Sequence, residues 1–243
     1  MKEPVLRVER LTKFYSGFIL RGADFSVYPG RIMGMIGRDG AGKTTALKCA
    51  LGLERPTAGT VRFFGLDQAG HDVEIKQRIG FLAASMEFYP RKKIRDIAAV
   101  VSRFYDTWDE GAYQKYVNLL DIDPQKSPAQ LGEAGQIKLF MLLSLSHQAE
   151  LLILDEPTTG KRPAVREELQ ELFKTLRREG VAILFTTSDT SDLDRCADDI
   201  TYLREGTVIA SEELVDFINY RRIRGFGNNL DKIMLHYEKE TRQ

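Results

Sequence analysis

The chain has 243 residues, of which 43% are apolar, and its 35 basic and 35 acidic side chains give a formal net charge of zero. This length and apolar content suit one large domain with a sizeable core, whereas the lack of a basic excess argues against a general nucleic-acid binder. No apolar run approaches the roughly 18–20 residues that span a bilayer, and the charged first residues carry no signal segment, so any membrane role is expected to come through a partner.

Short β segments dominate the first third of the chain. Alternating or apolar runs predict strands at residues 5–9, 18–20, 24–27, 31–36, 60–64 and 79–82. A helix is predicted at residues 44–53, directly after a glycine-rich stretch.

This glycine-rich stretch fits the phosphate-binding pattern G-x-x-x-x-G-K-[ST]. It consists of Gly37, Arg38, Asp39, Gly40, Ala41, Gly42, Lys43, Thr44 and Thr45. Glycines let backbone N–H groups approach phosphate oxygens, and the positive end of the following helix points at the same phosphates. Lys43 is expected to reach the β and γ phosphates of ATP, and the Thr44 hydroxyl is expected to bind Mg²⁺. An accidental glycine-rich turn is the alternative, but a strand before the stretch and a helix after it are the context that the motif requires.

From residue 89 to residue 147 the chain reads as helices. Apolar residues recur there at helical spacing, for example at Ile94, Ile97, Ala98, Val101 and Phe104. We therefore expect a helical subdomain inserted into an α/β core.

The core resumes with an apolar run at residues 151–154, which is typical of a parallel strand buried on both faces. The run ends in Asp155 and Glu156. An acidic residue at the carboxyl end of a buried strand is well placed to coordinate Mg²⁺, which predicts this role for Asp155. Glu156 could polarise the attacking water as a general base. Two acids that merely cap a strand end are the alternative, which the upstream phosphate loop disfavours.

The last third of the chain alternates helix and strand. A helix is predicted at residues 164–178 and a buried strand at 181–185, followed by a short helix and a hairpin around Glu205 and Gly206. A helical tail is expected from residue 211. This alternation points to a parallel sheet.

At this point the chain resembles the ATP-binding subunits of ABC transporters. That family carries a phosphate loop, a helical insert, a short signature and a hydrophobic strand ending Asp-Glu-Pro, and the resemblance runs from Leu11 to about Ala210. Residues 11–15 resemble the family's adenine-stacking segment, which implies that Tyr15 stacks on the base. A buried core aromatic is the alternative for Tyr15. Residues 229–235 resemble the C-terminal end of bacterial drug-exporter-type subunits.

We therefore expect an α/β fold with a P-loop NTPase core, an antiparallel β portion near the N-terminus and an inserted helical subdomain. The predicted organisation is a single ATPase domain, 1–243. Residues 1–88 and 149–210 form its α/β core, residues 89–148 its helical subdomain and residues 211–243 its helical C-terminal tail.

Four family motifs depart from the usual pattern. The glutamine that follows the strand at 79–82 falls at Ala84, and the switch histidine falls at Ser188. Gly160, Lys161 and Arg162 stand where the family usually has Gly-Leu-Asp. The signature Leu-Ser-Gly-Gly-Gln aligns with Leu131, Gly132, Glu133, Ala134 and Gly135.

Each departure has a chemical consequence. Ala84 cannot bind Mg²⁺ or hold a water, and Ser188 can donate a hydrogen bond to a γ-phosphate but lacks the reach of histidine. Ala134 replaces a glycine where the backbone must approach the γ-phosphate. A Glu133 carboxylate ~5 Å from the phosphate, at an effective dielectric constant of about 20, would be repelled by about 3 kcal/mol for each unit of phosphate charge. That repulsion disappears if Glu133 points to solvent.

The resemblance also implies a dimer, because two subunits of this family enclose two ATP molecules, and each site takes its signature from the other chain. A homodimer of this chain would be impaired at both sites, which favours a heterodimer with a better-equipped subunit. Lys161 and Arg162 could offset the missing donors near the partner's phosphates. Solvated loop charges are the alternative for both residues.

The chain is expected to be the ATP-hydrolysing subunit of a membrane transporter, with ATP and Mg²⁺ as cofactors. The resemblance of residues 229–235 to drug-exporter-type subunits favours an exporter. Transmembrane permease subunits and a second ATP-binding subunit are the expected partners, without nucleic acid. Through the permease, the chain is expected on the cytoplasmic face of the membrane. A regulatory subunit with little or no hydrolysis is the alternative, which the four departures favour and Glu156 opposes. Neutral charge and the lack of a second cassette disfavour a third reading, a soluble ATPase acting on nucleic acid or in protein assembly.

Overall fold

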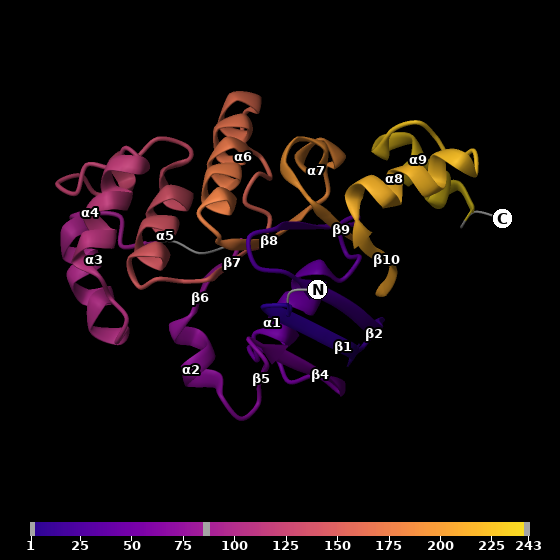
Figure 1. The fold of residues 1–243 in the computed structure, drawn as a ribbon, viewed down its shortest axis with the longest axis horizontal. Helices are drawn as coiled ribbons and strands as arrows, with labels where there is room; N and C mark the ends of the chain where they lie inside the picture. Colours follow the sequence, from indigo (N-terminus) through magenta and orange to yellow (C-terminus); the bar gives the residue numbers. More distant parts are fainter. Residues whose placement is uncertain (1–2, 85–87, 241–243) are drawn as a thin grey trace.

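The computed structural model describes residues 3–84 and 88–240 (Figure 1). Predictions on residues 1–2, 85–87 and 241–243, which belong to the predicted segments 1–88 and 211–243, lie outside the described residues.

Two sheets and the helices around them make up the described chain. The strands are β1 (Leu6–Tyr15), β2 (Phe18–Val27), β3 (Ile32–Ile36), β4 (Ala58–Phe63), β5 (Leu66–Asp67), β6 (Ile79–Leu82), β7 (Leu151–Leu154), β8 (Ala182–Thr187), β9 (Asp199–Arg204) and β10 (Thr207–Glu213). The helices are α1 (Lys43–Ala50), α2 (Asp72–Gln77), α3 (Ile94–Val101), α4 (Glu110–Leu119), α5 (Gly135–Ser146), α6 (Pro163–Arg178), α7 (Thr190–Cys196), α8 (Leu214–Ile223) and α9 (Leu230–Glu240). Two short 3₁₀ helices cover Ser102–Phe104 and Pro128–Gln130.

The larger sheet has the strand order β10-β9-β3-β8-β7-β6, and all neighbours except β10 and β9 run parallel. Every residue of β3, β7 and β8 is buried, because helices cover one face of the sheet and α1 with the smaller sheet covers the other. Successive side chains of a strand point to opposite faces, so Leu152 and Leu154 pack with the helices whereas Leu151 and Ile153 pack toward α1.

The smaller sheet is antiparallel, with the order β2-β1-β4-β5. The described helices α3, α4 and α5 gather at one end of the molecule, and α8 and α9 lie at the opposite end (Figure 1). Helix α5 is apolar nearly all round and buried along its length, because it packs between β6 on one side and α3 and α4 on the other.

The predicted helical start at residue 211 differs from the structure. Residues 211–213 continue β10, where Ser211 pairs with Thr201 and Glu213 pairs with Asp199 of β9, and α8 begins only at Leu214. The Thr201 and Ser211 hydroxyls lie 3.0 Å apart, so hydrogen bonding to the neighbouring strand extends the hairpin past its expected end. The division of the chain at residues 88, 148 and 210 stays a prediction. Within the described residues, none of the helices is both long enough and apolar enough to cross a bilayer.

Candidate functional site

Strand order brings the predicted site residues together. The phosphate loop follows β3, Asp155 and Glu156 follow β7, and β8 lies between these two strands. Because all three strands are parallel, their carboxyl ends meet at one edge of the sheet. The site therefore forms from segments that are more than a hundred residues apart in the sequence.

The loop needs glycine at two positions for different reasons. Gly42 has φ 107°, a left-handed conformation that other residues rarely adopt, and it precedes the first turn of α1. A Cβ on Gly37 would lie 2.3 Å from the carbonyl oxygen of Leu203, so the backbone of the loop passes too close to β9 for any side chain.

Lys43 lies inside this loop and is only 4% exposed. Its Nζ donates hydrogen bonds to the carbonyl oxygens of Gly37, at 2.7 Å, and Arg38, at 3.3 Å. The same Nζ lies 3.2 Å from Oε1 of Glu156. The ammonium group thus joins the phosphate loop to the acidic end of β7, at the place where phosphate oxygens would bind.

Thr44 and Asp155 place two hard oxygen atoms side by side. The Thr44 hydroxyl donates to Oδ2 of Asp155 at 2.9 Å, and the Thr186 hydroxyl donates to Oδ1 of the same buried carboxylate at 2.7 Å. Oxygen donors of this kind suit Mg²⁺, which usually keeps several waters and takes one or two protein ligands plus substrate phosphates. Within the described residues, no group of three or more His, Cys, Asp or Glu side chains is arranged to hold a metal. Thr44 and Asp155 therefore fit the predicted Mg²⁺ site.

Glu156 is held on several sides. Its backbone has φ 51°, an uncommon value for a residue other than glycine, and its N–H donates to the Thr186 hydroxyl at 2.8 Å. The Thr159 hydroxyl donates to Oε2 at 3.0 Å, and Lys43 faces Oε1. The side chain remains 23% exposed, so the carboxylate is both fixed and open to a reactant.

Tyr15 lines the same cavity as the phosphate loop. The cavity has a volume of about 430 Å³ and is lined by Tyr15, Phe18, residues 39–45 and Glu156. Tyr15 is 40% exposed, which contradicts the alternative that it is a core aromatic. Its ring centroid lies 6.5 Å from that of Phe18, and the two residues flank the turn, since Tyr15 ends β1 and Phe18 begins β2.

Sequence reasoning missed Phe18 and Thr186. Phe18 pairs with Tyr15 across the hairpin, and a Cβ on Gly42 would lie 2.7 Å from its ring. The signal for Phe18 was the tight turn at Ser16 and Gly17, which places it opposite Tyr15. The signal for Thr186 was a pair of hydroxyl side chains, Thr186 and Thr187, at the end of an apolar and fully buried strand.

The departures from the family pattern lie apart from this cavity. Ala84 is exposed in a turn after β6, and Ser188 is exposed directly after β8. Among the described residues that line the cavity, none comes from 131–135 or 160–162. Ala134 is buried in the hydrophobic core, so its methyl group points into its own chain.

Glu133 is not a free carboxylate, because Arg162 of the same chain binds both of its oxygens, whereas the repulsion of a partner's phosphate stays a prediction. The backbone N–H of Arg162 donates to Oε1 at 2.9 Å, and Nε of Arg162 donates to Oε2 at 2.6 Å. These hydrogen bonds from Arg162 lower the pKa of the Glu133 carboxyl. Arg162 therefore neutralises Glu133 within the chain, instead of standing as an unpaired cation toward a partner.

Known proteins are similar to this chain in sequence. The pattern of the ABC transporter family matches residues 20–159. The chain is 33% identical over 197 residues to "Nod factor export ATP-binding protein I" of Burkholderia orbicola, which is 79% of this chain and 65% of that protein. It is 26% identical over 245 residues to "Uncharacterized ABC transporter ATP-binding protein YhaQ" of Bacillus subtilis, covering 98% of this chain and 78% of that protein. The chain thus spans about two thirds of the first of these relatives.

Solved structures confirm the predicted fold class. A structure described as "Structure of ATP binding subunit of ABC transporter" superposes with a TM-score of 0.81 at 22% identity, over 98% of this chain and 99% of that one. CbiO1 from Clostridium perfringens, described as part of the transporter complex cbiONQ, gives a TM-score of 0.78 at 21% identity, over 98% of this chain and all of that one. Because the family pattern covers more than half of the sequence, the chain belongs to the ATP-binding subunits of ABC transporters.

Proposed function

We propose that the chain binds ATP between Tyr15 and the phosphate loop and hydrolyses it with Glu156 as general base, driving a membrane exporter through permease subunits. The observation that carries this proposal is the Glu156 carboxylate, which Lys43 and Thr159 contact. Thr186 accepts a hydrogen bond from the Glu156 backbone N–H and donates one to Asp155, which also accepts from Thr44. Similarity to the Nod factor export ATP-binding proteins supports the export direction. Attachment to the cytoplasmic face of the membrane would follow from the permease.

Each residue has a definite task in this reaction. Tyr15 offers an exposed ring face to the adenine, and the loop N–H groups with Lys43 bind the phosphates. Mg²⁺ bound through Thr44 and Asp155 would supply positive charge that neutralises the phosphate oxygens. Glu156 orients the attacking water and accepts its proton, while Lys43 stabilises the charge that develops on the transferred phosphoryl group.

The proposed partner is a second, different ATP-binding subunit. Ala84 and Ser188 leave this chain without the side chains that usually contact the γ-phosphate region in the family, and Gly132 and Glu133 replace the signature serine and the glycine after it. A homodimer would carry these departures at both sites, whereas a heterodimer would give Glu156 a complete signature from the other subunit. A regulatory subunit with little hydrolysis remains the second candidate, because the same departures favour it.

One experiment separates these functions. ATP hydrolysis and binding are measured for the wild type and for Glu156→Gln, each alone and assembled with its ATP-binding and permease partner subunits. We expect slow turnover alone, faster turnover in the assembly, and loss of this chain's single-turnover hydrolysis in Glu156→Gln with ATP binding retained. Steady hydrolysis by Glu156→Gln would refute the general base, and brisk cooperative hydrolysis by the isolated chain would refute the heterodimer. Hydrolysis in the assembly that does not respond to Glu156→Gln would support the regulatory subunit.

A further inference from the structure

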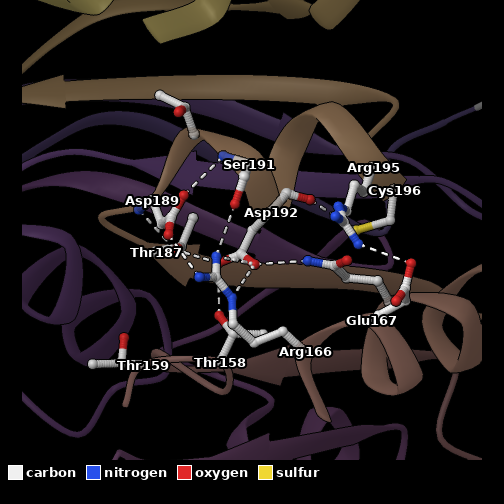
Figure 2. A network of polar contacts seen from close by, with 12 residues as sticks. Thr158, Thr159, Arg166, Glu167, Thr187, Asp189, Ser191, Asp192, Arg195 and Cys196 are labelled. Carbon is white, nitrogen blue, oxygen red and sulfur yellow. Dashed lines mark hydrogen bonds and ion pairs between the residues drawn. The ribbon is translucent and has the colours of Figure 1, made fainter. Parts of the chain in front are cut away.

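A buried carboxylate outside the ATP cavity joins four segments of the chain. Asp192, in the first turn of α7, is 1% exposed. Figure 2 shows the side chains of Thr158, Thr187 and Arg166 directed toward it. These residues come from the loop after β7, from the end of β8 and from α6.

Both oxygens of Asp192 are fully used. Oδ2 accepts hydrogen bonds from the hydroxyls of Thr158 and Thr187, each at 2.7 Å. Oδ1 accepts from Nη2 of Arg166 at 2.8 Å and from Nε2 of Gln170 at 2.7 Å. A buried carboxylate requires such compensation, because an unpaired charge in the interior is costly.

Arg166 connects this carboxylate to a second one. Its Nη1 lies 2.7 Å from Oδ2 of Asp189, and its Nη2 donates to the Ser191 hydroxyl at 3.0 Å. Burial raises the pKa of Asp189, but hydrogen bonds from Arg166 and Ser191 outweigh this and lower it overall. The Asp189 side chain also accepts from the Ser191 N–H at 2.9 Å, which caps the N-terminus of α7.

The network around Asp192 contacts the segments that follow β7 and end β8, next to Glu156 and Thr186. Thr158 lies two residues after Glu156, and Thr187 adjoins Thr186, which holds both Asp155 and the Glu156 N–H. The Asp189 N–H donates to the Thr187 hydroxyl at 3.0 Å, so Ser188 lies between two anchored residues. The loop after β7 is thus attached to β8 at two points. Thr186 of β8 binds the Glu156 N–H at the start of the loop, and Asp192 links Thr158 of the loop to Thr187 of β8.

Stability alone is a poor reason for such a network. Replacing a buried ion pair by well-packed apolar residues is often neutral or stabilising. The carboxylate instead fixes the relative position of two loops at the edge of the sheet where the phosphate loop also begins. Misplacement of a reacting group by about 1 Å can cost about 100-fold in rate.

We propose that Asp192, held by Arg166, is a positioning residue that fixes the Glu156 loop and Ser188 relative to the phosphate loop, so that it governs turnover and not ATP affinity. The inference rests on the role proposed for Glu156. It makes Asp192 part of the hydrolytic machinery, although its side chain does not line the ATP cavity.

The test compares Asp192→Asn, which keeps size but removes the charge, with Arg195→Gln. Arg195 forms an exposed pair with Glu167 at 3.0 Å, also between α7 and α6, and offers a matched control. For each full-length variant in the assembled transporter, kcat and KM are measured together with the Kd of a fluorescent ATP analogue. We expect Asp192→Asn to lower kcat by about 10- to 100-fold with a nearly unchanged Kd. Arg195→Gln should match the wild type in both quantities.

Thr158→Val provides a milder variant that keeps the fold even if Asp192→Asn does not. It removes one donor to Asp192 at nearly constant volume, and we expect kcat about 3- to 10-fold lower, again with the Kd retained. Amide hydrogen exchange should rise in residues 156–160 and 187–192 of either variant, and in neither segment of Arg195→Gln.

Two results would overturn the proposal: an unchanged kcat in folded Asp192→Asn and Thr158→Val, or an ATP affinity that falls in proportion to kcat. Glu156→Gln, measured in parallel, separates this failure from that of the proposed function. If Glu156→Gln abolishes turnover but the network variants do not lower it, the positioning role alone is wrong. If Glu156→Gln still turns over, the general base is wrong.

Discussion

The ATP cavity and the surface around Glu133 and Arg162 differ in how their charged groups are held. In the cavity, Lys43 and Glu156 contact each other and groups from separate elements, and Lys43 is nearly inaccessible. On the other surface, Glu133 and Arg162 pair with each other, and the Arg162 side chain is 78% exposed. The charged groups of the cavity are thus held by several elements, whereas Glu133 and Arg162 form a local pair at the surface. We infer that changes in the cavity should affect ATP directly, whereas changes on the surface should affect only what a partner experiences.

Removing the cation of the cavity should have the largest effect. In Lys43→Ala the phosphates lose a charged hydrogen-bond donor, so we expect ATP affinity to fall by about 100-fold and hydrolysis to become undetectable. Lys48→Ala, on the same helix, removes an exposed ammonium 3.6 Å from Glu54 and should leave both quantities unchanged. Titration of a fluorescent ATP analogue measures the affinity. Equal losses of ATP affinity in Lys43→Ala and Lys48→Ala would contradict a specific role of Lys43 in phosphate binding.

The cavity was also the more predictable of the two regions. Gly42, Lys43 and Asp155 follow patterns in which neighbouring residues specify the local geometry, and the apolar runs of β3, β7 and β8 predicted a buried sheet. The pairing of Glu133 with Arg162, 29 residues away, depends on how α5 and α6 pack and has no local signal.

The lack of a local sequence signal also explains why Phe18, Asp192 and the end of β10 were not predicted. Phe18 enters the cavity only because the β1–β2 turn folds it against Tyr15, and Asp192 reads as an ordinary polar residue at the start of a helix. Residues 211–213 have weak strand propensity, and hydrogen bonds to β9 make them part of β10.

Acid should loosen the helical end of the molecule before the cavity. His147 follows α5, is 2% exposed and stacks on Tyr105 with ring centroids 3.7 Å apart. Burial lowers its pKa to about 4. The folded state therefore holds His147 neutral while the unfolded chain takes up a proton below pH ~6.5, so stability is lost as the pH falls from about 6.5 toward 4.

For His147 this amounts to about 2 kcal/mol of unfolding free energy between pH 7 and pH 5. Urea denaturation at each pH measures it, and amide exchange should show α5 opening while residues 37–45 stay protected. His147→Gln removes the titrating group and should reduce the difference in unfolding free energy between pH 7 and pH 5, although the stability of this variant at pH 7 is expected to be lower. An unaltered pH dependence in that variant would contradict the assignment.

Reversing one charge of this surface should weaken the association with a partner subunit and leave the affinity for ATP unchanged. Arg162→Glu places two carboxylates together, so we expect ATP-dependent association with the second ATP-binding subunit to weaken by about tenfold. Glu133→Arg combined with Arg162→Glu restores an ion pair and should recover most of this loss. Arg195→Glu, in the exposed pair with Glu167, serves as the matched control. Sedimentation of the mixed subunits measures the association, and equal weakening by the control would argue against a specific surface.

The adenine end of the cavity should show the smallest effect. The ring of Tyr15 is 40% exposed, so stacking of a base would desolvate only part of it, and Tyr15→Ala should weaken ATP binding by about fivefold, near the low end for base stacking. Tyr15→Phe keeps the ring and should bind nearly as well as the wild type, because stacking does not need the hydroxyl. GTP affinity, measured alongside, should fall by the same factor, since every base has a stacking face. If Tyr15→Ala binds ATP normally while Phe18→Ala does not, the base stacks on the partner ring of the hairpin and Tyr15 serves only to support it.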